Sequence, residues 1–149
     1  MPKNNDADTI KVIKIGPNPV QVSADDVEEN PLRVTVRMPR YMQLRSGGSI
    51  LVDLGWGVDM PPLTLGIFTA LLELSHRIGL SVTAGMVTSN QEVRLSVTNR
   101  STRMAEIPEG EVLGHLWFVR PRELAIDVQV VPAEEPKRSY RSRDGVVSE

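Results

Sequence analysis

The sequence is a succession of short apolar segments interrupted by glycine and proline. Residues 32–38 alternate apolar and polar side chains with a period of two, which is typical of a strand with one buried face. Only residues 70–78 carry apolar residues at helical spacing without an intervening Gly or Pro. Many short strands and one helix predict an all-β sandwich or barrel. The other predicted strands are 10–15, 49–54, 80–87, 93–98, 112–119 and 124–131.

The turn residues and the composition divide the chain into three parts. Residues 1–31 are predicted to be an N-terminal strand followed by an acidic loop, and residues 32–131 to form the barrel. Gly55 and Gly57 are expected to bracket a loop that holds Trp56. Residues 132–149 are rich in Glu, Pro, Arg and Ser, a composition that cannot bury a core, so they are predicted to be a flexible basic tail.

The bulk composition excludes several classes of function. The 149 residues, 40% of them hydrophobic, suffice for one domain with a modest core. A net charge of −2 argues against a general nucleic-acid binder. The absence of cysteine excludes disulfides, a thiolate nucleophile and a Cys-based zinc site. No apolar run approaches the roughly 20 residues that span a bilayer, and the N-terminus is polar. A soluble, intracellular protein without membrane contact is expected.

Three motifs between Gly66 and Leu116 carry a family resemblance. They are Gly66 followed by Ala-Leu-Leu-Glu at 70–73, Gly-Met-Val-Thr-Ser-Asn at 85–90, and Gly-Glu-Val-Leu-Gly-His-Leu at 110–116. In this order they resemble the dUTPase and dCTP deaminase family over Tyr41 to Val131. The resemblance implies a distorted β-barrel or jelly roll with one short helix. It also implies a homotrimer, because that family forms trimers whose active sites straddle subunits.

The resemblance places the family's phosphate-binding Pro-Arg-Ser-Gly motif on Ala70, Leu71, Leu72 and Glu73. Arginine suits that task because its planar fork binds phosphate oxygens bidentately. Leu71 and Leu72 cannot do so, and Glu73 would repel phosphate.

The catalytic positions of the family are also changed. The water-activating Asp falls on Thr88, which cannot act as a general base near neutral pH. The hairpin is too short for the Tyr that packs on the sugar, and the later Gln becomes His115. The catalytic Glu of the deaminases falls on Ser96. The resemblance therefore implies a member without catalytic residues, and neither a cofactor nor a metal is expected.

Two functions remain after this comparison of motifs. The first is a non-enzymatic interaction or structural protein, a homotrimer with an unidentified protein partner, serving as a viral accessory protein or virion component. The alternative is an active or nucleotide-sensing dUTP diphosphatase with a rearranged site. That alternative needs a carboxylate near Thr88, and the candidates are Asp59, Glu73 and Glu92.

The histidines, the tryptophans, the leucines near residue 72 and the basic tail carry no specific functional assignment. His76 and His115 are expected to be structural or surface residues, because metal sites usually need three or more ligands. Trp56 and Trp117 are expected to be core or interface anchors. The leucines at 71, 72 and 74 are either an oligomer seam or core. The basic residues of the tail solubilise it or contact nucleic acid or an acidic partner weakly; they are Lys137, Arg138, Arg141 and Arg143. Candidate trimer-face residues are Val93, Leu95, Val97, Leu116 and Phe118.

Overall fold

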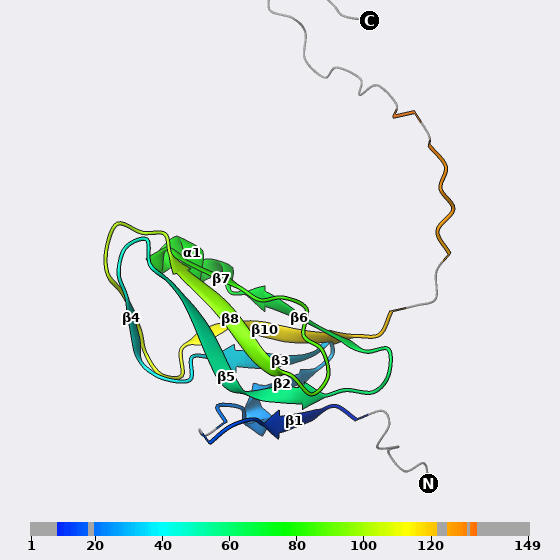
Figure 1. The fold of residues 1–149 in the computed structure, drawn as a ribbon, viewed down its shortest axis with the longest axis horizontal. Coiled ribbons are helices and arrows are strands. Elements are labelled where there is room, and N and C mark those ends of the chain that lie inside the picture. Colours follow the sequence, from blue (N-terminus) through cyan, green and yellow to red (C-terminus); the bar gives the residue numbers. More distant parts are fainter. Residues whose placement is uncertain (1–8, 18–19, 122–124, 131, 134–149) are drawn as a thin grey trace, which may run out of the picture.

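The computed structural model describes residues 9–17, 20–121, 125–130 and 132–133. Two four-stranded antiparallel sheets and a two-stranded sheet make up this part of the chain (Figure 1). The first sheet has the order β1 (Lys11–Lys14), β5 (Ser49–Asp59), β8 (Glu92–Asn99), β7 (Leu80–Thr83). The second has the order β2 (Val27–Glu29), β3 (Leu32–Arg37), β10 (Val112–Val119), β6 (Leu65–Ala70). The third pairs β4 (Met42–Leu44) with β9 (Ala105–Ile107).

The other described elements are a short 3₁₀ helix, η2 (Ala24–Asp26), and an α-helix, α1 (Leu72–Ile78). The prediction of an all-β chain with one short α-helix is confirmed. The described part of the N-terminal segment belongs to these sheets, since β1 pairs with β5 and β2 pairs with β3. In the described residues no helix has both the length and the apolar character needed to cross a membrane.

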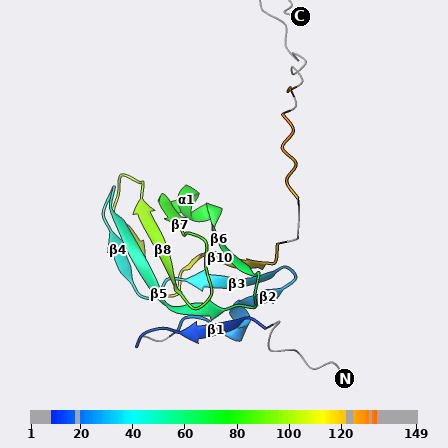
Figure 2. The ribbon, with the colours of Figure 1, turned by 45° about the vertical axis from the view of Figure 1, so that its right-hand side comes forward.

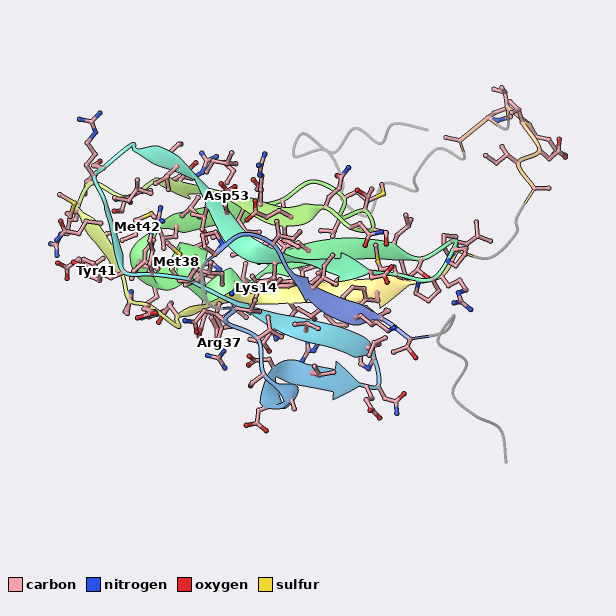
Figure 3. The ribbon with its side chains drawn as sticks, turned by 60° about the horizontal axis from the view of Figure 1, so that its bottom comes forward. Lys14, Arg37, Met38, Tyr41, Met42 and Asp53 are labelled. Atoms are coloured by element: carbon pink, nitrogen blue, oxygen red, sulfur yellow. The ribbon has the colours of Figure 1, made fainter. Side chains whose placement is uncertain are left out.

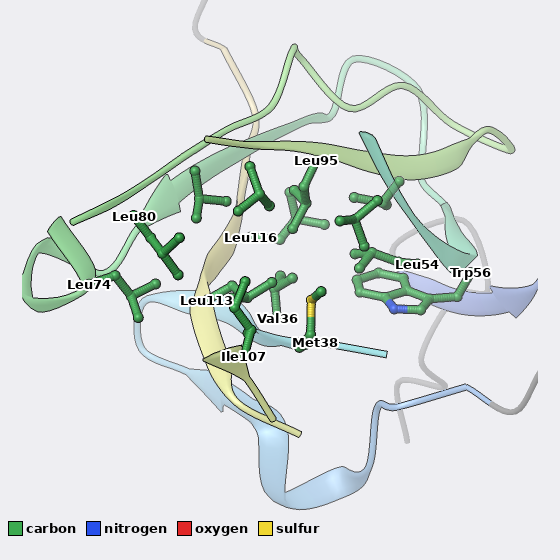
Figure 4. Close-up of a cluster of buried hydrophobic side chains, with 14 of the residues drawn as sticks. Val36, Met38, Leu54, Trp56, Leu74, Leu80, Leu95, Ile107, Leu113 and Leu116 are labelled. Carbon is green, nitrogen blue, oxygen red and sulfur yellow. The ribbon is translucent and has the colours of Figure 1, made fainter. Parts of the chain in front are cut away.

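The core lies between the sheets and follows the alternation of the strands. In β3, Val34 and Val36 are buried, while Arg33 and Thr35 lie on the other face. Figure 4 shows the packed interior, where Trp56 from β5 lies at one end and Leu74 from α1 at the other. Burial of such side chains contributes about 1.5–3 kcal/mol each, which makes this cluster the main source of stability.

The prediction that Trp56 lies in a loop is wrong. β5 continues through Gly55 and Gly57 to Asp59, and Trp56 is only 1% exposed. The strand continues because its register against β8 shifts between Asp53 and Gly57, and Gly55 takes a positive φ of 78° there. Glycines inside a strand often mark such a bulge and not a turn. The prediction that Trp56 is a core anchor is confirmed.

Several predicted boundaries also differ from the structure. The helix begins at Leu72, because Ala70 is still paired with Gly114 of β10. The strand predicted over 80–87 ends at Thr83, and Val87 makes only an isolated bridge to Gly66. The acidic loop over 23–31 contains η2 and β2. The strand predicted over 124–131 is not formed in residues 125–130, and residues 124 and 131 lie outside the described residues.

The prediction of a trimer face is wrong for most of the residues assigned to it. The side chains of Val93, Leu95 and Val97 on β8 are at most 1% exposed, and Leu116 is fully buried. They face the core because alternate residues of each strand point inward. Phe118 is half-buried and packs against the same core.

Candidate functional site

The junction between β6 and α1 holds the four positions that the motif comparison assigns to phosphate binding. Ala70 is the exposed last residue of β6, and Leu71 is the half-buried N-cap of α1. Leu72 is 73% exposed, and Glu73 places a carboxylate in the first turn. Leu71 makes no side-chain cap, and its backbone N–H donates to the carbonyl of Leu113 at 3.0 Å. The junction therefore presents two apolar side chains and one negative charge.

His115 lies beside this junction on the outer face of the second sheet. Its register partner on β6 is Thr69, next to Ala70, so the structure brings the positions at 70 and 115 together. The His115 ring makes an edge contact with Trp117, with 6.4 Å between centroids. Burial lowers the pKa of His115, and the charge of Arg33 lowers it further, whereas Glu28 acts in the opposite direction. His115 is therefore a neutral, packed side chain near pH 7.

The hairpin that contains Thr88 is fixed to two strands. Val87 exchanges backbone hydrogen bonds with Gly66, at 2.9 Å and 3.2 Å. Ser89 Oγ accepts from the Met60 N–H at 2.9 Å, and Asn90 N–H donates to the Val58 carbonyl at 2.7 Å. These bonds hold the hairpin against the end of β5 and the start of β6.

Thr88 itself is exposed, and its hydroxyl donates to Gln91 Oε1 at 2.8 Å. Beside it lies a small cavity of about 160 Å³, which we call the hairpin cavity. The residues that line this cavity include Gly85, Met86, Thr88, Gln91, Glu92 and Arg94.

Among the three candidate carboxylates, only Glu92 lines the hairpin cavity. Glu92 Oε2 accepts a hydrogen bond from the backbone N–H of Gly55 at 2.9 Å. Its other oxygen lies 3.8 Å from a guanidinium nitrogen of Arg94, and Arg94 also pairs with Asp53 at 2.9 Å. Glu92 is therefore held by the bulge of β5 and by a neighbouring cation.

A larger cavity of about 450 Å³, which motif comparison did not find, lies on the other side of Glu92. We call it the bulge cavity, because Asp53, Leu54 and Gly55 of β5 line it. Arg40 and Glu109 reach it from loops far apart in the sequence. Figure 3 labels Asp53 on β5 and Lys14 on the adjacent strand β1. No local sequence signal marks this cavity, because only the fold brings these segments together.

The structure also places the other residues that the sequence singled out. His76 is exposed on α1, and Leu74 is core, with 1% exposure. Among the described residues, no group of three or more His, Asp or Glu side chains is arranged to hold a metal ion. Lys137, Arg138, Arg141 and Arg143 lie outside the described residues.

No protein-family model matches the chain, and a sequence comparison with curated proteins finds no match. Solved structures do match. A dUTPase of the S. aureus phage phi11 has a TM-score of 0.66 and 13% identity, covering 86% of this chain and 100% of its own. The dUTPase of EIAV has a TM-score of 0.63 and 13% identity, and the match covers 86% of this chain and 98% of that dUTPase. A Staphylococcus bacteriophage 80alpha dUTPase with dUpNHpp has a TM-score of 0.65 and 12% identity. That match covers 93% of this chain and 99% of the phage dUTPase.

The chain has the dUTPase fold. This agrees with the resemblance drawn from the motifs and confirms the predicted jelly-roll-like barrel with one short helix. The match extends over nearly the whole length of each dUTPase. At 12–13% identity it establishes the fold alone.

Proposed function

We propose that this chain uses the dUTPase fold as a non-enzymatic interaction or structural module that assembles as a homotrimer. The observation that carries the proposal is the β6–α1 junction. In the motif comparison Leu71 and Leu72 fall on the family's phosphate-binding Arg and Ser, and Glu73 adds a negative charge in the first turn of α1. Neither leucine can donate a hydrogen bond, so a triphosphate would be desolvated there without compensation.

The Thr88 hairpin supports the same proposal. In the motif comparison Thr88 falls on the family's water-activating Asp, and in the structure its hydroxyl donates a hydrogen bond to Gln91. A threonine hydroxyl does not accept a proton near neutral pH. Losing one general base typically costs a factor of about 10²–10⁴, and losing charged phosphate contacts adds to that cost.

An interaction role is supported by the outer face of the second sheet. Ile67, which is 44% exposed, lies directly across from the half-buried Trp117, and Val119, which is 40% exposed, lies two residues further along β10. Aromatic and aliphatic side chains of this kind anchor many protein interfaces. The fold that this chain shares with phage and EIAV dUTPases supports a viral origin. Mass spectrometry of purified virus particles tests a virion role, because a virion component would be detected in them.

Calorimetric titration with dUTP and Mg²⁺, with pyrophosphate release followed in parallel, tests the proposal. The phage phi11 dUTPase serves as the positive control under the same conditions. We expect neither heat of binding nor pyrophosphate from this chain. Saturable binding or turnover would overturn the non-enzymatic assignment. Native mass spectrometry tests the assembly separately, with three copies of the 16.5 kDa chain as the expected species.

A second candidate function is a dUTP diphosphatase with a rearranged site, and Glu92 favours it. Its carboxylate lines the hairpin cavity beside Thr88, as a replacement base would need to. Under this alternative, pyrophosphate release occurs and Glu92→Gln reduces it by about 10²-fold or more. Asp59→Asn is the matched control, because Asp59 does not line the hairpin cavity. Equal release by both variants would exclude Glu92 as the base.

A further inference from the structure

The bulge cavity has two charged walls, which come from different sheets. Asp53 of β5 and Glu92 of β8 form the wall on the first sheet and carry two negative charges. Arg40 and Glu109 form the other wall, with one charge of each sign. Their loops run side by side, because Met38 exchanges backbone hydrogen bonds of 2.8 Å with the turn before β10. Figure 2 shows the two sheets, with β5 and β8 in one and β3 and β10 in the other.

The bulge cavity also has the size and the apolar surface of a small-molecule site. Its volume of about 450 Å³ lies within the range of about 300–1,000 Å³ that is typical of ligand pockets. Ile15, Pro39 and Leu51 contribute apolar surface to the lining, and Leu51 is 61% exposed. A ligand in this cavity would cover the exposed leucine while its polar groups meet the charged walls.

The acidic wall already holds a guanidinium group. Arg94 Nε lies 2.9 Å from Asp53 Oδ1, and a terminal nitrogen of the same group lies 3.8 Å from Glu92 Oε1. The Arg94 side chain is 58% exposed, so this pairing faces water and is weak. Within the described residues, nothing bonds to the second oxygen of Asp53. The two carboxylates therefore retain a free acceptor and suit a planar cation, which can bond to both.

The opposite wall offers a cation of its own. Arg40 is exposed and forms no ion pair or side-chain hydrogen bond with the part of the chain that the structure describes. Its neighbour Glu109 accepts a hydrogen bond from the side-chain amide of Gln21 at 3.2 Å. A guanidinium without a carboxylate partner is available to an anionic group of a ligand.

We propose that the bulge cavity binds a small molecule with a guanidinium group at one end and a carboxylate at the other. The guanidinium lies against Asp53 and Glu92, the aliphatic chain covers Leu51, and the carboxylate meets Arg40. This site shares no residue with the β6–α1 junction and goes beyond the proposed interaction role.

Amide NMR of the full chain tests the inference with two probes. γ-Guanidinobutyrate carries both charged groups on a short aliphatic chain, and propylguanidine is the same molecule without the carboxylate. The amide signal of Gly55 reports on the site, because its N–H donates to Glu92 at 2.9 Å. We expect a saturable shift with γ-guanidinobutyrate and a larger Kd for propylguanidine. No saturable shift at the bulge would overturn the inference, and equal Kd values for the two probes would overturn the contact with Arg40.

Two variants separate the walls of the cavity. Asp53→Asn should weaken the binding of both probes by about fivefold. Asp59→Asn is its matched control, because Asp59 lies on the same strand and outside the cavity lining. Arg40→Gln should weaken the binding of γ-guanidinobutyrate alone, whereas Arg103→Gln, which is also outside the lining, should change neither Kd. Equal Kd values for Asp53→Asn and Asp59→Asn would overturn the inference.

A third variant should improve binding. Arg94→Gln leaves the carboxylates of Asp53 and Glu92 to the ligand, so both probes should bind severalfold more tightly. A Kd that is unchanged or larger in this variant would show that the probes do not use these carboxylates, and would overturn the inference. The titration with dUTP and Mg²⁺ tests the proposed function separately, so the failure of one leaves the other in place.

Discussion

The guanidinium carbon of Arg33 lies 4.9 Å from the centroid of the Trp117 ring on the outer face of the second sheet. Trp117 also donates from Nε1 to Thr69 Oγ1 at 2.6 Å, and Arg33 pairs with Glu28 at 2.6 Å. Side chains from four neighbouring strands are thus linked across this face. The arrangement holds an aromatic side chain in a fixed position at the surface.

We expect Trp117→Phe to lower the free energy of unfolding by about 1–2 kcal/mol, because it removes the hydrogen bond and weakens the cation–π contact. Thr69→Val removes only the hydrogen bond and should cost about half as much. Chemical denaturation of both variants gives the comparison. Identical stability of the Trp117→Phe variant and the natural chain would contradict the structural role of this contact.

Stability should depend on pH through His115. Its pKa in the folded chain is below the ordinary value of 6.5, because burial and Arg33 disfavour the charged ring. Its contribution is therefore fully present above pH 6.5 and is lost as pH falls through the folded pKa. Thermal unfolding between pH 5 and 8 should show this loss. His115→Gln should flatten the curve. Equal curves for the natural chain and this variant would refute the assignment.

Gly114 should not tolerate a side chain. A Cβ at this position would lie 2.2 Å from the backbone oxygen of Thr69 and 2.9 Å from the Cα of Ala70. Gly114→Ala therefore forces β10 and β6 apart, and we expect a loss of about 3 kcal/mol. Gly85→Ala is the matched control, since nothing lies within 4 Å of its Cβ position. Urea unfolding of both variants checks the difference, and a fully stable Gly114→Ala chain would show that the strands are farther apart.

The buried amide of Asn99 should be among the most sensitive polar groups. It is 0% exposed and donates to the carbonyls of Leu44 and Arg103, at 2.8 Å and 2.7 Å. It also accepts from the backbone and the hydroxyl of Ser101, at 3.0 Å and 2.7 Å. Asn99→Ala leaves these partners unsatisfied and should cost about 3 kcal/mol. Ser101→Ala removes fewer bonds and should cost less, so similar losses measured by denaturation would argue against this network.

The fold was predictable where one strand face is apolar and the other polar. β3 shows this, because Val34 and Val36 alternate with polar residues in the sequence and are buried in the structure. β5 was predicted short because Gly55 and Gly57 resemble a turn, whereas a bulge lets the strand continue through them. β4 and β9 have three residues each, too few for periodicity to reveal.

The site was predictable only where it follows a contiguous motif. The β6–α1 junction and the Thr88 hairpin are short segments, so their residues lie together as expected. The bulge cavity is assembled from residues such as Arg40, Asp53 and Glu109, which are far apart in the chain. Their partners are set by sheet order, which the period of a sequence does not encode. Burial of Val93, Leu95 and Val97 likewise depends on which face of β8 turns inward.

Glu92 separates the hairpin cavity from the bulge cavity and lines both of them. One carboxylate therefore contributes negative charge to two spaces at once, and it accepts a hydrogen bond from Gly55, which lines the larger one. A molecule that draws the carboxylate away from Gly55 would break this hydrogen bond and leave the Gly55 N–H without it. The two cavities are consequently not independent compartments, and any adaptation of one toward a ligand is also a change to the other.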